Sequence, residues 1–315
     1  MLRNIPAASA LDRGTEFLLD ERGERRFAPA KINLYLHVTG RRPDGYHLLD
    51  SLVVFADVGD SIVAEPADDL TLSVDGDFSD SLVAEPDNLV LKAAERLRAA
   101  ATVERGARLR LTKNLPVAAG LGGGSADAAA ALHALAALWD LSEESVVASD
   151  LAVGLGADVP VCLAGRPARM LGIGEVLRPP PPLPPFHLVL VNPGLPLSTA
   201  AVFARLADEG GYRSAEAAPP PAVKRFDKAV DLASALATCG NDLEEPARTM
   251  MPEVGKVLDA IAASPDCLLA RMSGSGPTCF GLFASETAAA AGAISLGRVS
   301  DRWWVRAAPV WESAA

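Results

Sequence analysis

Apolar and polar residues alternate in the first part of the chain, which is the pattern of a β-strand lying on a hydrophobic core. Between residues 31 and 38 every second position is apolar, and Lys31 and Asn33 fall in between. A period of two indicates a half-buried strand, so Lys31 and Asn33 share its polar face. The Asp44-Gly45 pair predicts a tight turn, and the apolar run at 48–56 predicts a second strand that returns beside the first.

The rest of the chain mixes strand and helix periods. Pro86-Asp87-Asn88 predicts the start of a helix that runs to about residue 101, with Asp87 as its N-cap. Further strands are expected at 61–65, 70–74, 108–112, 186–191, 268–272, 279–283 and 304–308. Further helices are expected at 125–139, from 142 to about 155, and at 199–208, 227–238, 244–263 and 286–295. This order fits two α+β domains better than a strict βαβ alternation.

The length of 315 residues also suggests about two domains. The proline-rich run at 178–185 cannot form a helix or a central strand, so we take it as the domain boundary. Residues 1–26 mix acidic and basic side chains without the apolar segment of a secretory signal, and we interpret them as a polar extension. No apolar run is long enough to span a membrane, and a cytoplasmic protein is expected.

Composition narrows the function. The 29 Lys and Arg against 40 Asp and Glu give a formal net charge of −11, which repels a phosphate backbone and disfavours nucleic acid as a partner. The four cysteines show no C-x-x-C spacing, so a disulfide framework and a structural zinc site are disfavoured as well. A protein of this charge that binds an anion must create positive potential locally.

A glycine-rich segment between a predicted strand and a predicted helix offers such a place. Residues 116–126 read PVAAGLGGGSA, with four glycines in the five positions 120–124. Glycines allow close approach of backbone N–H groups to an anion, and a following helix N-terminus adds free donors and a positive dipole end. The alternative is a tight turn that binds nothing. Two familiar phosphate loops are excluded, because the chain lacks the lysine of G-x-x-x-x-G-K-[ST] and has Ser125 where G-x-G-x-x-G needs glycine.

This segment resembles the phosphate loop of the GHMP kinases. Further resemblances lie in APAKINLYL at 28–36 with DGYH at 44–47, LGADVP at 155–160, and SGSGPT at 273–278. The family resemblance implies a two-domain GHMP kinase fold, with a ribosomal-protein-S5-domain-2-like N-terminal domain at 27–178 and a ferredoxin-like C-terminal domain at 186–315. It also implies that SGSGPT closes the second domain on the phosphate loop.

The resemblance assigns Lys31 and Asp158 as the catalytic pair. Asp158 would accept the proton of a substrate hydroxyl, and Lys31 would keep Asp158 ionised and orient it. From the residues alone, Asp158 would instead cap a turn at Val159-Pro160, and Lys31 would be the exposed end of a strand.

The resemblance also implies the ligand contacts. Asn33, Tyr46, His47 and Phe203 would bind the acceptor substrate, although Tyr46 and His47 could be hairpin residues and Phe203 a core residue. Ser125 would be the protein contact to Mg²⁺, and no carboxylate partner for it is evident. The expected ATP contacts are Asn88, Lys113, Pro116, Val117, Ala118, Ala119, Gly120, Leu121, Gly122, Gly123, Gly124, Ser125 and Ala126. From the residues alone, Lys113 would be a solvated strand end and Asn88 a helix cap.

The activity implied is ATP-dependent phosphorylation of the 2-hydroxyl of 4-diphosphocytidyl-2-C-methyl-D-erythritol, a step of the non-mevalonate isoprenoid pathway. Asn33 and the turn at 44–47, which carries the ring of Tyr46, favour a substrate with a base. A small aliphatic acceptor has no base to stack on such a ring, which disfavours a kinase of the mevalonate or homoserine type. A nucleotide-binding module without catalysis is a more distant alternative, because it would not need both Lys31 and Asp158. Only small molecules, and neither nucleic acid nor a membrane, are expected as partners.

Overall fold

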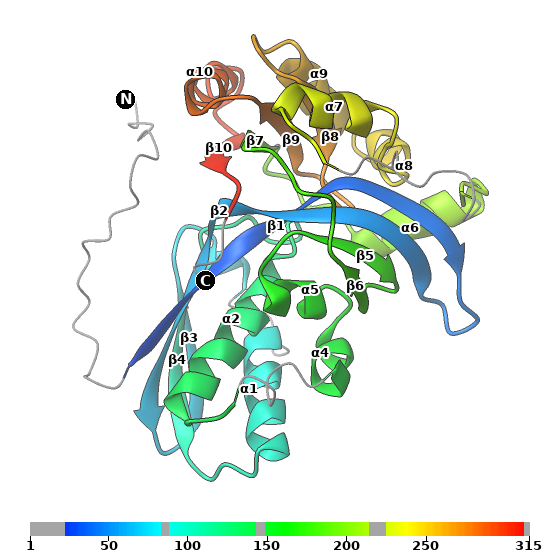
Figure 1. Ribbon diagram of the computed structural model, residues 1–315. Helices are drawn as coiled ribbons and strands as arrows, with labels where there is room; N and C mark the ends of the chain where they lie inside the picture. Colours follow the sequence, from blue (N-terminus) through cyan, green and yellow to red (C-terminus); the bar gives the residue numbers. More distant parts are fainter. Residues whose placement is uncertain (1–22, 83–87, 143–148, 214–224, 312–315) are drawn as a thin grey trace.

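A computed structural model of the chain describes residues 23–82, 88–142, 149–213 and 225–311, and it contains two β-sheets with their own helices (Figure 1). The first sheet has the strand order β3-β4-β2-β5-β6, and β1 pairs with β2 beside this path. All its neighbouring strands are antiparallel except β3 and β4. Its strands are β1 (Glu24–Arg41), β2 (His47–Ala67), β3 (Leu70–Asp75), β4 (Gly106–Thr112), β5 (Ala168–Gly172) and β6 (Val176–Arg178).

The predicted N-terminal hairpin is present and is longer than expected. β1 and β2 pair from Glu24 with Ala64 to Arg41 with His47, and Gly45 has the positive φ of +94° that its turn requires. The two strands predicted at 48–56 and 61–65 are one continuous strand, β2, because three register shifts allow the hairpin to bend without ending.

The prediction that the first strand is half-buried is wrong. Residues 30–38 of β1 are buried on both faces, including Lys31 at 3% exposure and Asn33 at 0%. The physical reason is that helix α2 packs against one side of the hairpin while the second sheet and its helix α7 cover the other. Lys31 is therefore not an exposed strand end.

Helices of the first domain pack against this sheet. They are η1 (Ser79–Ser81), α1 (Leu89–Ala100), α2 (Gly123–Leu138), α4 (Ser149–Leu155) and α5 (Val159–Ala164). The prediction of Asp87 as N-cap is wrong, since the side chain of Asn88 caps α1 by accepting from the Val90 N–H; Asp87 itself lies outside the described residues. The helix start expected at Ser142-Glu143 also lies partly outside the described residues, which end at 142 and resume at 149. Four short elements, η1, α5, β5 and β6, were not predicted.

The second sheet has the order β10-β7-β9-β8, with every neighbouring pair antiparallel. If the four strands are numbered by their order in the chain, their order in the sheet is 4-1-3-2. This is the expected ferredoxin-like arrangement. The predicted helix at 244–263 is two helices, because Pro252 begins a new one. The elements are β7 (His187–Asn192), β8 (Leu269–Met272), β9 (Cys279–Phe283), β10 (Trp304–Pro309), α6 (Thr199–Asp208), α7 (Ala229–Ala237), α8 (Glu244–Met250), α9 (Pro252–Ala262) and α10 (Glu286–Leu296).

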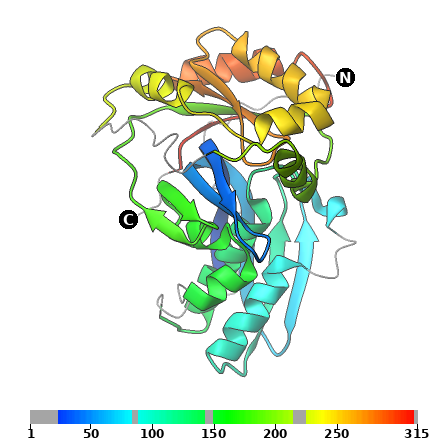
Figure 2. The same ribbon diagram turned by 90° about the vertical axis from the view of Figure 1, so that its right-hand side faces the viewer.

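The hairpin β1–β2 lies between the two domains, where it contacts both (Figure 2). Its apolar side chains enter three clusters: Val53 packs in the first domain, Leu34 packs between the domains, and Val38 packs in the second domain. The segment 179–186 connects the two sheets without helix or strand, as its prolines predict. Among the described residues no helix has the length and apolarity to cross a membrane.

Candidate active site

A cleft of about 1130 Å³ opens beside the buried hairpin. Ligand pockets usually measure roughly 300–1,000 Å³, so this cleft has room for two ligands. The polar face of β1, the glycine-rich loop, the start of α5, the tip of the hairpin, helix α6 and the loop before β9 all contribute to its wall. Segments far apart in the sequence therefore meet at one site.

The glycine-rich loop lines this cleft and has the backbone geometry of an anion-binding loop. Ala118, Gly120 and Gly122 have positive φ values of +51°, +72° and +62°. Helix α2 begins at Gly123, so its first N–H groups have no helical acceptors and lie at the positive end of the dipole. Of the predicted ATP contacts in residues 116–126, all line the cleft except Leu121 and Ala126, whose side chains are buried in the cores.

Two glycines of this loop cannot carry a side chain. A Cβ on Gly122 would come within 2.8 Å of Lys31 Cε and 3.1 Å of Lys31 Cβ. A Cβ on Gly120 would collide with the carbonyl oxygen of Ser273. The glycines thus serve close packing against β1 and the second domain as well as access to an anion.

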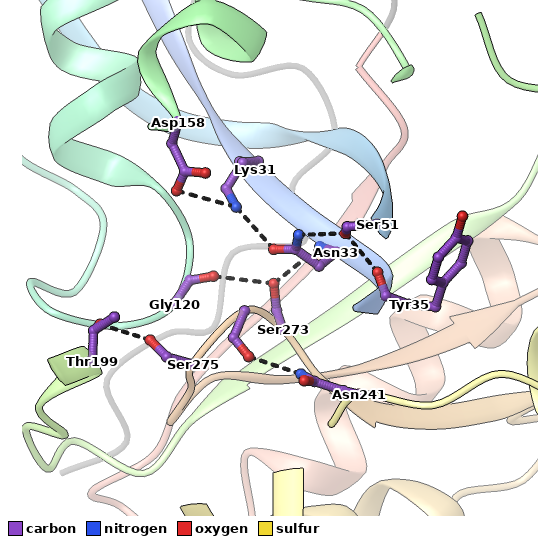
Figure 3. Close-up of polar contacts among 11 residues, drawn as sticks. Lys31, Asn33, Tyr35, Ser51, Gly120, Asp158, Thr199, Asn241, Ser273 and Ser275 are labelled. Carbon is purple, nitrogen blue, oxygen red and sulfur yellow. Dashed lines mark hydrogen bonds and ion pairs between the residues drawn. The ribbon is translucent and has the colours of Figure 1, made fainter. Parts of the chain in front are cut away.

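Lys31 and Asp158 meet at the wall of the cleft, as the resemblance implied (Figure 3). Lys31 Nζ is 3.2 Å from Asp158 Oδ2 and donates to Asn33 Oδ1 at 2.9 Å. The lysine side chain is 4% exposed and the aspartate 33% exposed. A buried ammonium held on two sides can orient a carboxylate that still faces the cleft.

The capping role considered for Asp158 is absent. Asp158 stands at the N-cap position of α5, but its side chain makes no capping hydrogen bond. Pro160 is the second residue of the helix and has no N–H to offer, which removes one of the two usual capping donors. The carboxylate therefore remains available for chemistry.

Asn33 is fixed by a chain of buried hydrogen bonds. Its Nδ2 donates to Ser51 Oγ at 2.8 Å, and Ser51 Oγ donates to the Tyr35 carbonyl oxygen at 2.6 Å (Figure 3). With Nδ2 on Ser51, Oδ1 is directed to Lys31. The sequence predicted the shared face of Lys31 and Asn33, and the structure confirms that they touch.

Lys113 lies beneath the phosphate loop within a buried triad. Its Nζ contacts Asp60 Oδ2 and Asp127 Oδ2, and a Cβ on Gly123 would stand 3.0 Å from it. Asp60 Oδ1 accepts two backbone N–H groups, whereas Asp127 Oδ1 has no partner among the described residues. One ammonium thus faces two buried carboxyl groups, so Lys113 adds less positive charge to the loop than its position in the sequence suggested.

The triad shifts the ionisation of its members. Burial, with a contribution from Asp60, raises the pKa of Asp127 to about 8 against the attraction of Lys113. Burial lowers the pKa of Lys113, but the two carboxylates outweigh it and the net shift is upward. Asp127 is thus a carboxyl group that keeps its proton up to near pH 8 in the folded protein.

Asp127→Asn is expected to change the pH dependence of stability. The folded-state pKa of about 8 exceeds the ordinary 3.8, so the folded protein keeps a proton that the unfolded chain releases. The free energy of unfolding of the wild type therefore falls as the pH rises from about 4 to about 8. The variant lacks this titration, and its stability relative to the wild type should increase from pH 5 to pH 8 by on the order of 4 kcal/mol. Denaturant unfolding at both pH values measures it.

The exposed Asp259→Asn on α9 is the control for that measurement, since it removes a carboxylate that has no buried partner. A constant difference in unfolding free energy between Asp127→Asn and the wild type across this pH range would contradict the shift.

Aromatic rings gather in another part of the cleft. His47 stacks on Phe203 with ring centroids 4.5 Å apart and planes at 27°, and Tyr46 is 55% exposed. Tyr212 Oη lies 3.4 Å from His47 Nε2. Burial, and to a smaller extent Arg41, lowers the pKa of His47 below 6.5, so the ring is neutral at pH 7 and carries one donor and one acceptor. This arrangement suits the face and edge of a planar base.

Other cleft residues escaped the sequence analysis. Thr199 and Ser275 join α6 to the loop before β9 through a 2.7 Å hydroxyl contact, and both line the cleft. Tyr212 does not line the cleft itself but contacts His47, which does. It follows a Gly-Gly pair, and a lone tyrosine in such a segment gives no signal of this contact. The predicted Asn88 also lines the cleft while it caps α1.

Comparison with known proteins supports the same class. A model of the GHMP kinases N terminal domain matches residues 88–166, and a model described as GHMP kinases C terminal matches residues 221–296. A relative from Paramagnetospirillum magneticum is 55% identical over 282 residues, covering 88% of this chain and 95% of its own. The chain therefore belongs to the GHMP kinase family, and it is a small-molecule kinase.

Within that family the similarity points to one branch. The relative from Paramagnetospirillum magneticum is named 4-diphosphocytidyl-2-C-methyl-D-erythritol kinase. A protein of the same name from Cereibacter sphaeroides is 54% identical over 280 residues, covering 89% of this chain and 96% of its own. A crystal structure of 4-(cytidine 5'-diphospho)-2C-methyl-D-erythritol kinase aligns with a TM-score of 0.71 and 36% identity, covering 92% of this chain and all of that one. A homoserine kinase from Cytophaga hutchinsonii, at 18% identity and a TM-score of 0.68, shares the fold.

Proposed function

We propose that this kinase transfers the γ-phosphoryl group of ATP to the 2-hydroxyl of 4-diphosphocytidyl-2-C-methyl-D-erythritol, in the non-mevalonate pathway of isoprenoid precursor synthesis. One observation carries the proposal: a single cleft is lined by a phosphate-binding loop, a Lys31–Asp158 pair and an aromatic cluster. A mevalonate or homoserine acceptor would leave that cluster without a partner. Residues 27–178 and 186–315 act in this proposal as the two domains that enclose the cleft.

The reaction assigns a separate task to each polar group. The acceptor hydroxyl oxygen forms a bond to the γ-phosphorus, the bond from that phosphorus to the oxygen bridging to the β-phosphate breaks, and ADP leaves. The hydroxyl proton passes to the Asp158 carboxylate, which acts as general base. Lys31 holds that carboxylate in place, and Asn33 orients the lysine by accepting its hydrogen bond. Charge on the transferred group is stabilised by donors that are already in position.

The nucleotide end relies on uncharged donors. Loop N–H groups and the first turn of α2 bind the phosphates, with Asn88 at the mouth of the same region. Mg²⁺, when bound, neutralises phosphate charge during the transfer. The residues present fit an ion held mainly by phosphate oxygens and water, because no group of three His, Cys, Asp or Glu side chains in the described part could hold a metal. Ser125 in the first turn of α2 is the protein hydroxyl placed to contact it.

The acceptor end recognises the cytosine ring. Tyr46 is free to cover one face of the base, and Phe203 offers the other face when His47 moves to the base edge. A neutral His47 supplies both a donor and an acceptor for that edge. Stacking on an aromatic ring contributes about 1–3 kcal/mol per base in nucleic-acid complexes.

The acceptor is tested by measuring γ-phosphoryl transfer from ATP to three alcohols: the cytidyl substrate, mevalonate and homoserine. The purified chain should use the cytidyl substrate with a kcat/KM at least about fivefold above the others, since loss of stacking alone removes about 1–3 kcal/mol. Comparable use of mevalonate or homoserine would refute the proposal.

Tyr46→Ala serves as the matched variant in this assay and should raise the KM for the cytidyl substrate by about 5- to 100-fold while leaving the KM for ATP unchanged. Tyr46→Phe keeps the ring and should behave as the wild type. A rise in the KM for ATP instead would place Tyr46 on the nucleotide side.

A further inference from the structure

β1 interrupts its pairing with β2 immediately beside the polar side chains of the site. Asn33 pairs with Val53 and Tyr35 pairs with Leu52, so Leu34 has no partner in the ladder. Such a bulge frees backbone groups and changes the direction of neighbouring side chains. The conformation of this bulge therefore sets where Asn33, and through it Lys31, faces the cleft.

The second domain supplies the partners that the bulge lacks. Arg271 on β8 donates from Nη1 to the Leu34 carbonyl oxygen at 2.7 Å and from Nη2 to the Leu236 carbonyl oxygen at 2.9 Å. The Ser273 hydroxyl accepts the Asn33 backbone N–H at 3.2 Å. Two residues of one strand and its following loop thus hold the carbonyl oxygen of the unpaired Leu34 and the N–H of the residue before it.

Ser273 also reaches the phosphate loop. Its hydroxyl donates to the Gly120 carbonyl oxygen at 3.1 Å, so one oxygen atom bridges β1 and the loop (Figure 3). The backbone makes a second link, from Lys31 N–H to the Leu121 carbonyl oxygen at 2.8 Å. A hydroxyl from the other domain thus adds to the direct backbone link that holds β1 against the glycine-rich loop.

Burial makes these contacts specific. Ser273 is 0% exposed and Arg271 is 6% exposed, and burial lowers the pKa of the arginine. Burying a guanidinium is unfavourable unless its N–H groups are hydrogen-bonded. If Arg271 only filled space, an apolar side chain would stabilise the fold more. The guanidinium instead donates a hydrogen bond to the Leu34 carbonyl oxygen, which the bulge leaves unpaired.

We propose that Ser273 and Arg271 are positioning residues for phosphoryl transfer. By holding the β1 bulge, they fix Asn33 and Lys31 relative to the phosphate loop. Neither residue lines the cleft, and both act through backbone atoms of β1. This inference rests on the proposed function for the identity of the acceptor, whereas the geometry it invokes is independent of that acceptor.

The test compares Ser273→Ala with Ser264→Ala. Ser264 is also buried and donates its hydroxyl to a carbonyl oxygen, that of Ala260, far along the chain from the bulge. Ser273→Ala should lower kcat by about 10- to 100-fold, because small displacements of positioned groups are costly, with the KM for ATP changed less than about twofold. Ser264→Ala should lose similar thermal stability and keep its kcat. A kcat for Ser273→Ala within twofold of the Ser264→Ala value would overturn the proposal.

A double-mutant cycle identifies the route of the effect. If Ser273 acts through Asn33, the kcat of Ser273→Ala combined with Asn33→Ala should fall little below that of Asn33→Ala alone. Losses that multiply would assign Ser273 an independent role and reject the proposal. Arg271→Lys retains one donor and should be less impaired in kcat than Arg271→Met, and equal losses would remove Arg271 from it.

These measurements use whichever alcohol of the three-acceptor assay the wild type phosphorylates fastest. Failure of the wild type to prefer the cytidyl substrate would then refute the proposed function alone. Losses in kcat that multiply in the double mutant would refute the positioning roles alone.

Discussion

Replacing Asp158 with asparagine is expected to lower kcat by about 10²- to 10⁴-fold, the usual contribution of a general base. The amide keeps the size of the side chain and its place at the start of α5 but cannot take the hydroxyl proton. Because Asp158 pairs with Lys31 and is not a residue of the glycine-rich loop, the affinity for ATP should change little. Steady-state kinetics with nucleotide titration of the same sample measure both quantities.

The control for Asp158→Asn is Asp301→Asn, which removes an exposed carboxylate outside the cleft. It should retain wild-type turnover. A loss below about tenfold for Asp158→Asn would show that the carboxylate only orients the substrate, as a loose transition state permits.

Gly122→Val should nearly abolish nucleotide binding, with an expected loss of affinity of at least about 100-fold. The new side chain meets Lys31, whose Cβ is 3.1 Å and whose Cε is 2.8 Å from the added Cβ, so both the loop and the lysine must move. The φ of +62° adds strain, since a left-handed conformation costs a β-carbon about 1–2 kcal/mol. Calorimetric titration with ATP measures the loss.

Gly210→Val separates strain from crowding in that experiment. Gly210 has a φ of +68° and nothing within 4 Å of an added Cβ, so it carries the strain without the collision. It should lose thermal stability but keep its ATP affinity. Unchanged ATP affinity in Gly122→Val would move the phosphate site away from this loop.

Sequence reasoning reached the parts of the site whose signal is local. The hairpin at Asp44-Gly45, the glycine loop and the helix after it were predictable because turn residues and periodicity lie within a few positions of each other. The pairing of Lys31 with Asp158 came from the family resemblance, and the structure places the two in contact.

The remaining features depend on contacts between distant segments. Periodicity could not show that β1 is buried on both faces, because the covering elements, α2 on one side and the second sheet with α7 on the other, lie far along the chain. Asp60 and Asp127 carry no local pattern that marks them as partners of Lys113. The bulge at Leu34 is likewise invisible in an alternating sequence, since only the register with β2 defines it.

The net charge of −11 acquires a more specific meaning from the triad. Lys113 is already matched by Asp60 and Asp127, so the affinity for polyphosphate must come chiefly from backbone N–H groups and the dipole of α2. A loop of this kind needs no surplus of basic residues, and an acidic surface is compatible with it.

The first strand also bears on how the molecule moves and melts. Ala28 packs in the core of the first domain, Ile32 between the domains and Val38 in the core of the second. A wide hinge opening would have to pull one continuous strand out of two cores. For the same reason we expect the two sheets to unfold together and not one after the other.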